Sequence, residues 1–161
     1  MFGKILISSC FLGKKVRYNG KVIPFIHHYI TQWQQQQRLI AICPEVNGGL
    51  AVPREPAEQQ NKLGKVITVS GQDVSHQFKS GAQQALALCQ KYDIYFALLK
   101  ESSPSCGSTN IYDGSFSNQK VTGKGITTLL LEEHGIKVFS EYTIENLADS
   151  LKIKEGNKGK G

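Results

Sequence analysis

Residues 5–10 read Ile5-Leu6-Ile7-Ser8-Ser9-Cys10, a short apolar run that ends in two hydroxyls and a thiol. Four similar runs follow along the chain, and short apolar runs in which β-branched residues are common are typical of strands. The five predicted strands cover Ile5–Ser8, Leu39–Ile42, Val66–Val69, Ile94–Leu99 and Lys137–Phe139.

Segments with helical spacing separate these strands. The clearest one runs from Ser75 to Tyr92 and places its apolar residues, Cys89 among them, on one stripe. Helices are also predicted over residues 24–37, 125–134 and 143–153. Strands that alternate with helices indicate βαβ units. We therefore predict an α/β fold, with a mostly parallel sheet and helices on both faces, in a Rossmann-like three-layer arrangement within a single domain.

The length and charge of the chain fit this organisation. Its 161 residues are enough for one domain over residues 1–142, followed by a C-terminal helix over 143–153 and a disordered basic tail over 154–161. Residues 152–161 alone supply +3 of the net charge of +6. The folded body is thus only mildly basic, which suits an anionic or nucleobase-bearing small molecule as well as it suits RNA.

Nothing in the sequence indicates a membrane or secretory segment. No stretch approaches the roughly 20 apolar residues of a spanning helix, and the apolar run before Cys10 is too short for a signal peptide. We therefore expect a cytoplasmic protein without membrane contact. Because the cytosol keeps thiols reduced, its four cysteines should be core residues, nucleophiles or metal ligands rather than disulfides.

Three of the four cysteines follow predicted strands. Cys10 follows the first strand, Cys43 the second, and Cys106 lies just beyond the fourth. The carboxyl ends of parallel strands share one edge of a sheet, so these three thiols are expected to converge there. Cys89 lies in the middle of a predicted helix, where a free cysteine behaves as a small hydrophobic residue.

The number and spacing of these cysteines narrow the chemistry. A structural zinc site usually needs four ligands, often in closely spaced pairs, and a thiol oxidoreductase would be supported by a Cys-x-x-Cys motif; neither pattern exists here. A lone catalytic thiol would need a histidine partner, but all four histidines fall in predicted helices. Thiolates also hold iron–sulfur clusters, and a cubane with three protein ligands leaves one iron open to a substrate.

A series of motifs in chain order then matches a known family. It includes Cys43-Pro44-Glu45-Val46 with Gly48-Gly49, Ser103-Pro104-Ser105-Cys106-Gly107 and Ile111-Tyr112-Asp113-Gly114. Over roughly residues 4–141 the chain resembles the thiouracil desulfidase (TudS) family. The resemblance implies a non-redox enzyme that removes sulfur from 2- or 4-thiouracil, or from its nucleoside or nucleotide, and gives uracil and hydrosulfide. It also implies a [4Fe–4S] cluster held by Cys10, Cys43 and Cys106.

The resemblance further implies roles for polar residues around the cysteines. Glu45 would be the acid/base, and Ser103 with Ser105 would orient the substrate or relay protons. Proton transfer of this kind is typically worth about 10²–10⁴ in rate, and nearby thiolates would favour the protonated, acidic form of Glu45. The residues expected to contact the substrate are Ser9, Arg17, Asn47, Arg54, Ser102 and Asp113.

Other interpretations of the same residues remain open. Arg17 and Arg54 could each brace a surface loop, a role that fits them about as well as a substrate contact. Asp113-Gly114 is first of all a turn signal. The whole chain could also be a non-catalytic sulfur-handling or RNA-binding accessory module. As partners we expect a thiolated pyrimidine or a tRNA-derived nucleotide rather than DNA, and either a monomer or a homodimer.

Overall fold

A four-stranded parallel sheet forms the centre of the computed structural model, which describes residues 2–22, 25–60 and 64–158. The strand order is β2-β1-β5-β8, and every pair of neighbours is parallel. The bounds of these strands are Ile5–Ser8 for β1, Leu39–Ile42 for β2, Phe96–Leu98 for β5 and Lys137–Phe139 for β8. The mostly parallel sheet expected from the sequence is confirmed.

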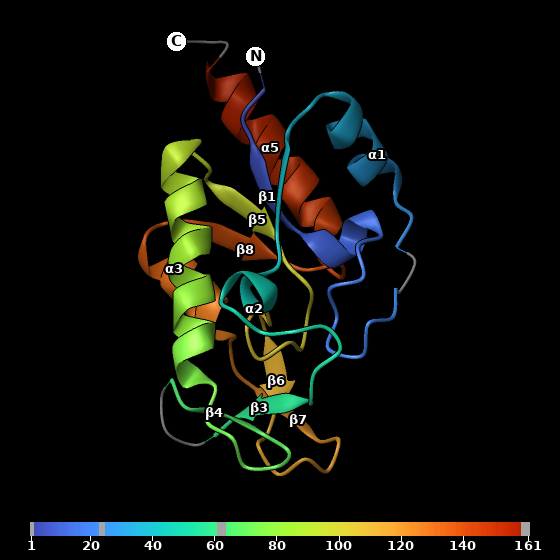
Figure 1. Cartoon of the computed structure of the whole chain (residues 1–161). Helices are drawn as coiled ribbons and strands as arrows, with labels where there is room; N and C mark the ends of the chain where they lie inside the picture. The colour runs from blue at the N-terminus through green and yellow to red at the C-terminus, as the bar shows by residue number, and fades with distance from the viewer. Residues whose placement is uncertain (1, 23–24, 61–63, 159–161) are drawn as a thin grey trace.

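Side chains that alternate along the strands give the sheet two buried faces. Ile5 and Ile7 of β1 pack with α1 (His28–Gln35) and α5 (Ile144–Lys158). Leu6, which lies between them, belongs to the cluster on the other face, with α3 (Ser75–Lys91) and α4 (Ile126–Glu133). Figure 1 shows α3 on one side of the sheet and α1 and α5 on the other, so the predicted three-layer α/β arrangement is confirmed.

Two small antiparallel hairpins lie outside the main sheet. The predicted strand at Val66–Val69 is observed as β4 (Val66–Thr68), but it pairs with β3 (Ala57–Gln59) rather than with the parallel strands. Val66 is buried although it lies outside the main sheet, because it packs with Val74 and Phe78 in a separate apolar cluster. The second hairpin joins β6 (Asn110–Tyr112) to β7 (Lys120–Thr122), and both hairpins lie beyond the same end of the sheet (Figure 1).

The observed helix ends differ most from the predicted ones at the start of α1 and the end of α5. Helix α1 begins at His28, where the His27 ring accepts the N–H of Tyr29; residue 24, the predicted start, lies outside the described residues. Helix α5 runs on to Lys158, so residues 154–158 of the predicted disordered tail are helical, while residues 159–161 lie outside the described residues. One reason is an ion pair at 2.6 Å between Glu155 and the buried Arg38.

Two short helices that follow β1 and β2 were not predicted. They are η1 (Ser9–Leu12), which contains Cys10, and α2 (Pro44–Asn47), which begins directly after Cys43. Helix α2 rests on α3 at Gly81, where a Cβ atom would lie only 1.8 Å from the Pro44 carbonyl oxygen. The absence of a side chain at Gly81 therefore sets the position of α2, and with it that of Cys43.

None of the helices within the described ranges has the length and apolar character needed to cross a membrane.

Candidate metal centre and active site

A cavity of about 440 Å³ opens beyond the carboxyl ends of β1, β2 and β5, and Cys10, Cys43 and Cys106 all line it. The expected convergence of these three cysteines is therefore confirmed, although their role as ligands remains a prediction. Cys89 is 2% exposed and packs in the core between the sheet and α3, which confirms its structural placement.

The three cavity thiols are protonated at neutral pH when no metal is bound. Burial, followed by the nearby Cys43 thiol, raises the pKa of Cys10 to about 11, against the opposing positive charges of Lys100 and Arg17. Burial also raises the pKa values of Cys43 and Cys106, and for Cys106 the charges of Glu45 and Cys43 add to the effect. Binding of a metal here must therefore displace protons.

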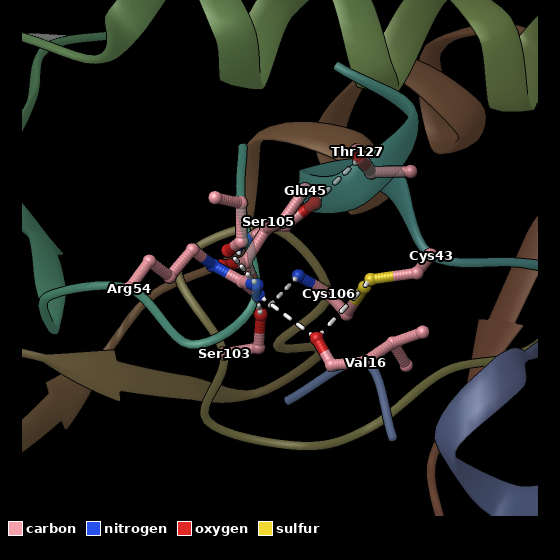
Figure 2. A network of polar contacts seen from close by, with 9 residues as sticks. Val16, Cys43, Glu45, Arg54, Ser103, Ser105, Cys106 and Thr127 are labelled. Carbon is pink, nitrogen blue, oxygen red and sulfur yellow. Dashed lines mark hydrogen bonds and ion pairs between the residues drawn. The ribbon is translucent and has the colours of Figure 1, made fainter. Parts of the chain in front are cut away.

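Three thiols at one cavity are a donor set that suits an iron–sulfur cluster. Within the described residues, no group of three or more His, Cys, Asp and Glu side chains is arranged to hold one metal ion. Sulfur ligands of one tetrahedral ion lie about 3.8 Å apart, whereas a cubane bonds each cysteine to a different iron and needs a wider triangle. Cys43 and Cys106 point toward one another (Figure 2). The Cys43 thiol raises the pKa of Cys10, and the Cys43 and Cys10 thiols both raise the pKa of Cys106.

Glu45 lies in the first turn of α2 and is held at both carboxylate oxygens. Arg54 donates to Oε1 through Nη2 at 3.1 Å and Nε at 3.3 Å, and the Ser103 hydroxyl donates to Oε2 at 3.1 Å (Figure 2). Arg54 also donates to the Val16 carbonyl at 3.1 Å, which keeps the guanidinium in place.

Ser103 joins this carboxylate to the third cysteine. While its hydroxyl donates to Glu45, its oxygen accepts the backbone N–H groups of Ser105 at 3.1 Å and Cys106 at 3.2 Å. A serine that accepts from the backbone two and three residues further on fixes the turn between them. The predicted pair of Glu45 and Ser103 is therefore brought together, directly beside Cys106.

The other predicted site residues divide into two groups. Four of them line the cavity: Ser9, Arg17, Arg54 and Ser102. Three do not line it, contrary to the prediction: Asn47, Ser105 and Asp113.

Each of these three side chains is engaged elsewhere. Asn47 lies two residues beyond Glu45, about 200° around the helix axis, and its exposed amide contacts Gln84 of α3. The Ser105 hydroxyl is 0% exposed and lies 2.8 Å from the hydroxyl of Thr127. The Asp113 carboxylate accepts the N–H and hydroxyl of Ser115, which is the turn role.

The sequence did not identify two buried carboxylates in the cavity wall. Glu101 accepts hydrogen bonds from Ser108, Thr109 and other loop residues, and Glu58 accepts the N–H groups of Gly114 at 3.0 Å and Phe116 at 3.3 Å. Burial alone would raise the pKa of Glu101, but these hydrogen bonds lower it to about 2. The signal that could have found Glu101 is the run of serines, threonine and asparagine around it between residues 102 and 110.

Further residues that line the cavity were not among the predicted site residues. Lys100 forms an ion pair with Glu141, and its backbone N–H donates to the Ser8 hydroxyl at 3.1 Å. The hairpin of β6 and β7 supplies part of the polar and aromatic wall: Tyr112, Phe116, Asn118 and Lys120. Their positions depend on tertiary contacts of the hairpin, so only the structure could reveal them.

Comparison with known proteins agrees with this site. The family model described as 2-thiouracil desulfurase matches residues 5–143. This chain belongs to that family. The enzyme family expected from the motifs is therefore confirmed, and the match spans β1 through β8 and includes all three cavity cysteines.

Two known proteins resemble the chain over almost its full length. A solved structure of the [4Fe–4S]-dependent thiouracil desulfidase TudS superimposes with a TM-score of 0.91 at 46% identity and covers 94% of this chain and 99% of its own. The uncharacterized protein YbbK of Bacillus subtilis (strain 168) is 38% identical over 151 residues, covering 89% of this chain and 99% of YbbK. The likeness therefore extends to the whole fold.

Proposed function

We propose that this protein removes sulfur from a thiolated uracil, with a [4Fe–4S] cluster bound by Cys10, Cys43 and Cys106. The observation that carries the proposal is the meeting of three thiols and the Glu45–Ser103 pair in one cavity. The likeness to a [4Fe–4S]-dependent thiouracil desulfidase at 46% identity supports it. When bound, such a cluster supplies an iron with an open coordination position, a Lewis acid suited to the departing sulfur.

The reaction replaces a C=S bond with a C=O bond and needs no oxidant or reductant. Water adds to the thiocarbonyl carbon, the C–S bond breaks, and the sulfur leaves as hydrosulfide. The two protons of the water must be removed from the oxygen, so the site needs a group that accepts a proton and can give it to the leaving sulfur.

Glu45 is the carboxylate best placed to move these protons. Three glutamates line the cavity, but the carboxylates of Glu58 and Glu101 accept hydrogen bonds from backbone N–H groups of the surrounding loops. Glu45 is instead held by two side chains, and the Ser103 hydroxyl on its Oε2 can rotate and relay a proton. Arg54 holds the other oxygen at 3.1 Å, so the carboxylate is fixed in place in the cavity wall.

The substrate would be oriented by the polar groups that share this cavity. Ser9 and Ser102 offer hydroxyls that can donate or accept, and Arg17 offers a planar guanidinium suited to a ring carbonyl or an anion. The proposed substrates are 2- and 4-thiouracil and their nucleosides or nucleotides, including a nucleotide derived from tRNA. We further propose that the protein works in the cytoplasm, as a monomer or homodimer.

Anaerobic reconstitution with iron and sulfide tests the proposal directly. We expect the brown absorption of a cubane, about four irons per chain, and release of sulfide from 2-thiouracil, 4-thiouracil or a thiouridine. A Cys106→Ser variant should lose both the iron and the activity, whereas Cys89→Ser should keep them. A colourless protein after reconstitution contradicts the cluster; a loaded cluster with no sulfide release from any of these substrates contradicts the desulfidase and favours an accessory sulfur-handling role.

A further inference from the structure

Glu101 lies in the cavity wall but has no role in the proton transfers proposed for Glu45. Its side chain is 4% exposed, and its Oε1 atom accepts four backbone N–H groups, from Ser102 at 3.2 Å, Ser108 at 2.8 Å, Thr109 at 3.1 Å and Asn110 at 3.3 Å. Its Oε2 atom accepts the hydroxyls of Ser108 at 2.6 Å and Thr109 at 3.2 Å. One carboxylate thus closes the loop between residues 102 and 110.

The charge of Glu101 is compensated by the loop itself. Among the ion pairs of the described residues, none involves Glu101, so the buried negative charge depends on these six hydrogen bonds. An uncompensated buried charge is strongly unfavourable, and hydrogen bonds to an ionised acceptor are about twice as strong as neutral ones. The loop must therefore keep the conformation in which its N–H groups point at this carboxylate.

Cys106 lies inside the loop that Glu101 closes. The carboxylate binds the chain on both sides of the cysteine, at Ser102 before it and at Ser108 only two residues after it. Further contacts fix the cysteine itself: its N–H donates to Ser103, and its carbonyl accepts the Thr128 hydroxyl at 2.9 Å. All of these contacts join one protein group to another, and none needs a metal.

We propose that Glu101 is a positioning residue that presets the Cys106 loop for its cluster before iron is bound. The inference rests on the proposed function only in taking Cys106 as a ligand. Cys10 and Cys43 are placed differently, by η1 and by the contact of α2 with Gly81, so loss of Glu101 should loosen one ligand of the three. If the loop had to become ordered when the cluster binds, the entropy cost would weaken cluster binding. The cluster would then be released faster.

Amide hydrogen exchange of the iron-free protein under anaerobic conditions is the first test. In the wild type we expect the amides of Ser108, Thr109 and Asn110 to be protected. In Glu101→Gln, which keeps the side-chain size but removes the charge, these amides should exchange at least about tenfold faster, while those of β1 and β5 stay unchanged. Unprotected loop amides in the wild type itself would overturn the proposal, whatever the variants do.

Retention of the cluster is the second test. After reconstitution, an iron chelator should strip Glu101→Gln about tenfold faster than the wild type, which corresponds to about 1.4 kcal/mol. The matched control is Glu155→Gln, which removes a carboxylate paired with Arg38 at the opposite edge of the sheet and should lower overall stability without changing the loop. Equal cluster loss from wild type and Glu101→Gln, or equal acceleration in both variants, contradicts the positioning role. Since exchange is measured without iron or substrate, it does not depend on whether the loaded protein releases sulfide.

Discussion

The Ser103 hydroxyl donates to Oε2 of Glu45 at 3.1 Å, across 58 positions of the chain. The same hydroxyl oxygen accepts the N–H of Cys106, so one serine connects the proposed acid/base to a proposed cluster ligand. Glu45 reaches this point from α2 after β2, and Ser103 from the loop after β5. The pair therefore exists only because β2 and β5 flank β1 with their carboxyl ends at one edge.

Serine substitutions should separate the three cavity cysteines from the fourth. We expect Cys10→Ser, Cys43→Ser and Cys106→Ser each to lose most of the iron after anaerobic reconstitution, because an alkoxide forms far less readily than a thiolate and binds iron poorly. Cys89→Ser should retain iron at the wild-type level and show only reduced thermal stability, because it places a hydroxyl in an apolar core. Iron content and visible absorption measure the outcome; normal iron in any of the first three variants contradicts its role as a ligand.

Glu45→Gln should lower kcat by about 10²–10⁴ and leave the cluster in place, since the amide keeps the size of the carboxyl but cannot take up a proton. Sulfide release under saturating substrate, together with iron content, distinguishes this outcome from simple loss of the cofactor. An unchanged kcat would exclude Glu45 as the proton carrier.

Two neighbouring serines offer a matched comparison. Ser103→Ala should reduce kcat and also loosen Cys106, because it removes the bond to Glu45 and the acceptor for the Cys106 N–H. Ser105→Ala should leave kcat close to that of the wild type and lower stability by about 1 kcal/mol, because its buried hydroxyl contacts Thr127 rather than the cavity. Chemical denaturation and turnover of both variants test this. A large loss of kcat in Ser105→Ala alone would show that Ser105 takes part in catalysis.

Gly81→Ala should displace α2 from α3. The added Cβ atom would lie 1.8 Å from the Pro44 carbonyl oxygen, so the overlap should cost about 1–3 kcal/mol and shift Cys43 and Glu45. Gly156→Ala in α5 is the control, since nothing lies within 4 Å of its added Cβ, and it should raise stability by up to about 1 kcal/mol. Urea unfolding and iron content report both effects; a neutral Gly81→Ala would show that α2 can move without loss of the site.

The contribution of Glu101 to stability should depend on pH. Its folded pKa of about 2 lies below the ordinary 4.5, so its stabilising effect is complete above pH 4.5 and is lost as the pH falls from there toward about 2. Wild type should therefore be more stable than Glu101→Gln at neutral pH, and the difference should shrink through this acidic range. Urea unfolding of both iron-free proteins at a series of pH values measures it. A difference that stays constant with pH would mean that the charge of Glu101 does not stabilise the fold.

Local pattern was sufficient for the elements that form the sheet. The predicted bounds of β1, β2 and β8 agree with the structure, because short apolar runs between polar segments have few alternatives to a buried strand. The strand at Val66–Thr68 was also found, but its antiparallel partner and its place outside the main sheet were not. The apolar pattern of a strand does not specify which sheet it joins, because pairing depends on tertiary contacts.

The sequence by itself determined that Cys10, Cys43 and Cys106 would meet, because strand order and the shared carboxyl edge of a parallel sheet leave few other outcomes. It also separated Cys89, since position on an apolar helical stripe is a local property. Only the tertiary structure decided which polar side chains reach the cavity: Arg54 and Ser103 hold Glu45, Glu101 closes the Cys106 loop, and Ser105 turns toward Thr127. These contacts join residues far apart in the chain through loops and turns, where side-chain direction depends on packing rather than on any repeat in the sequence.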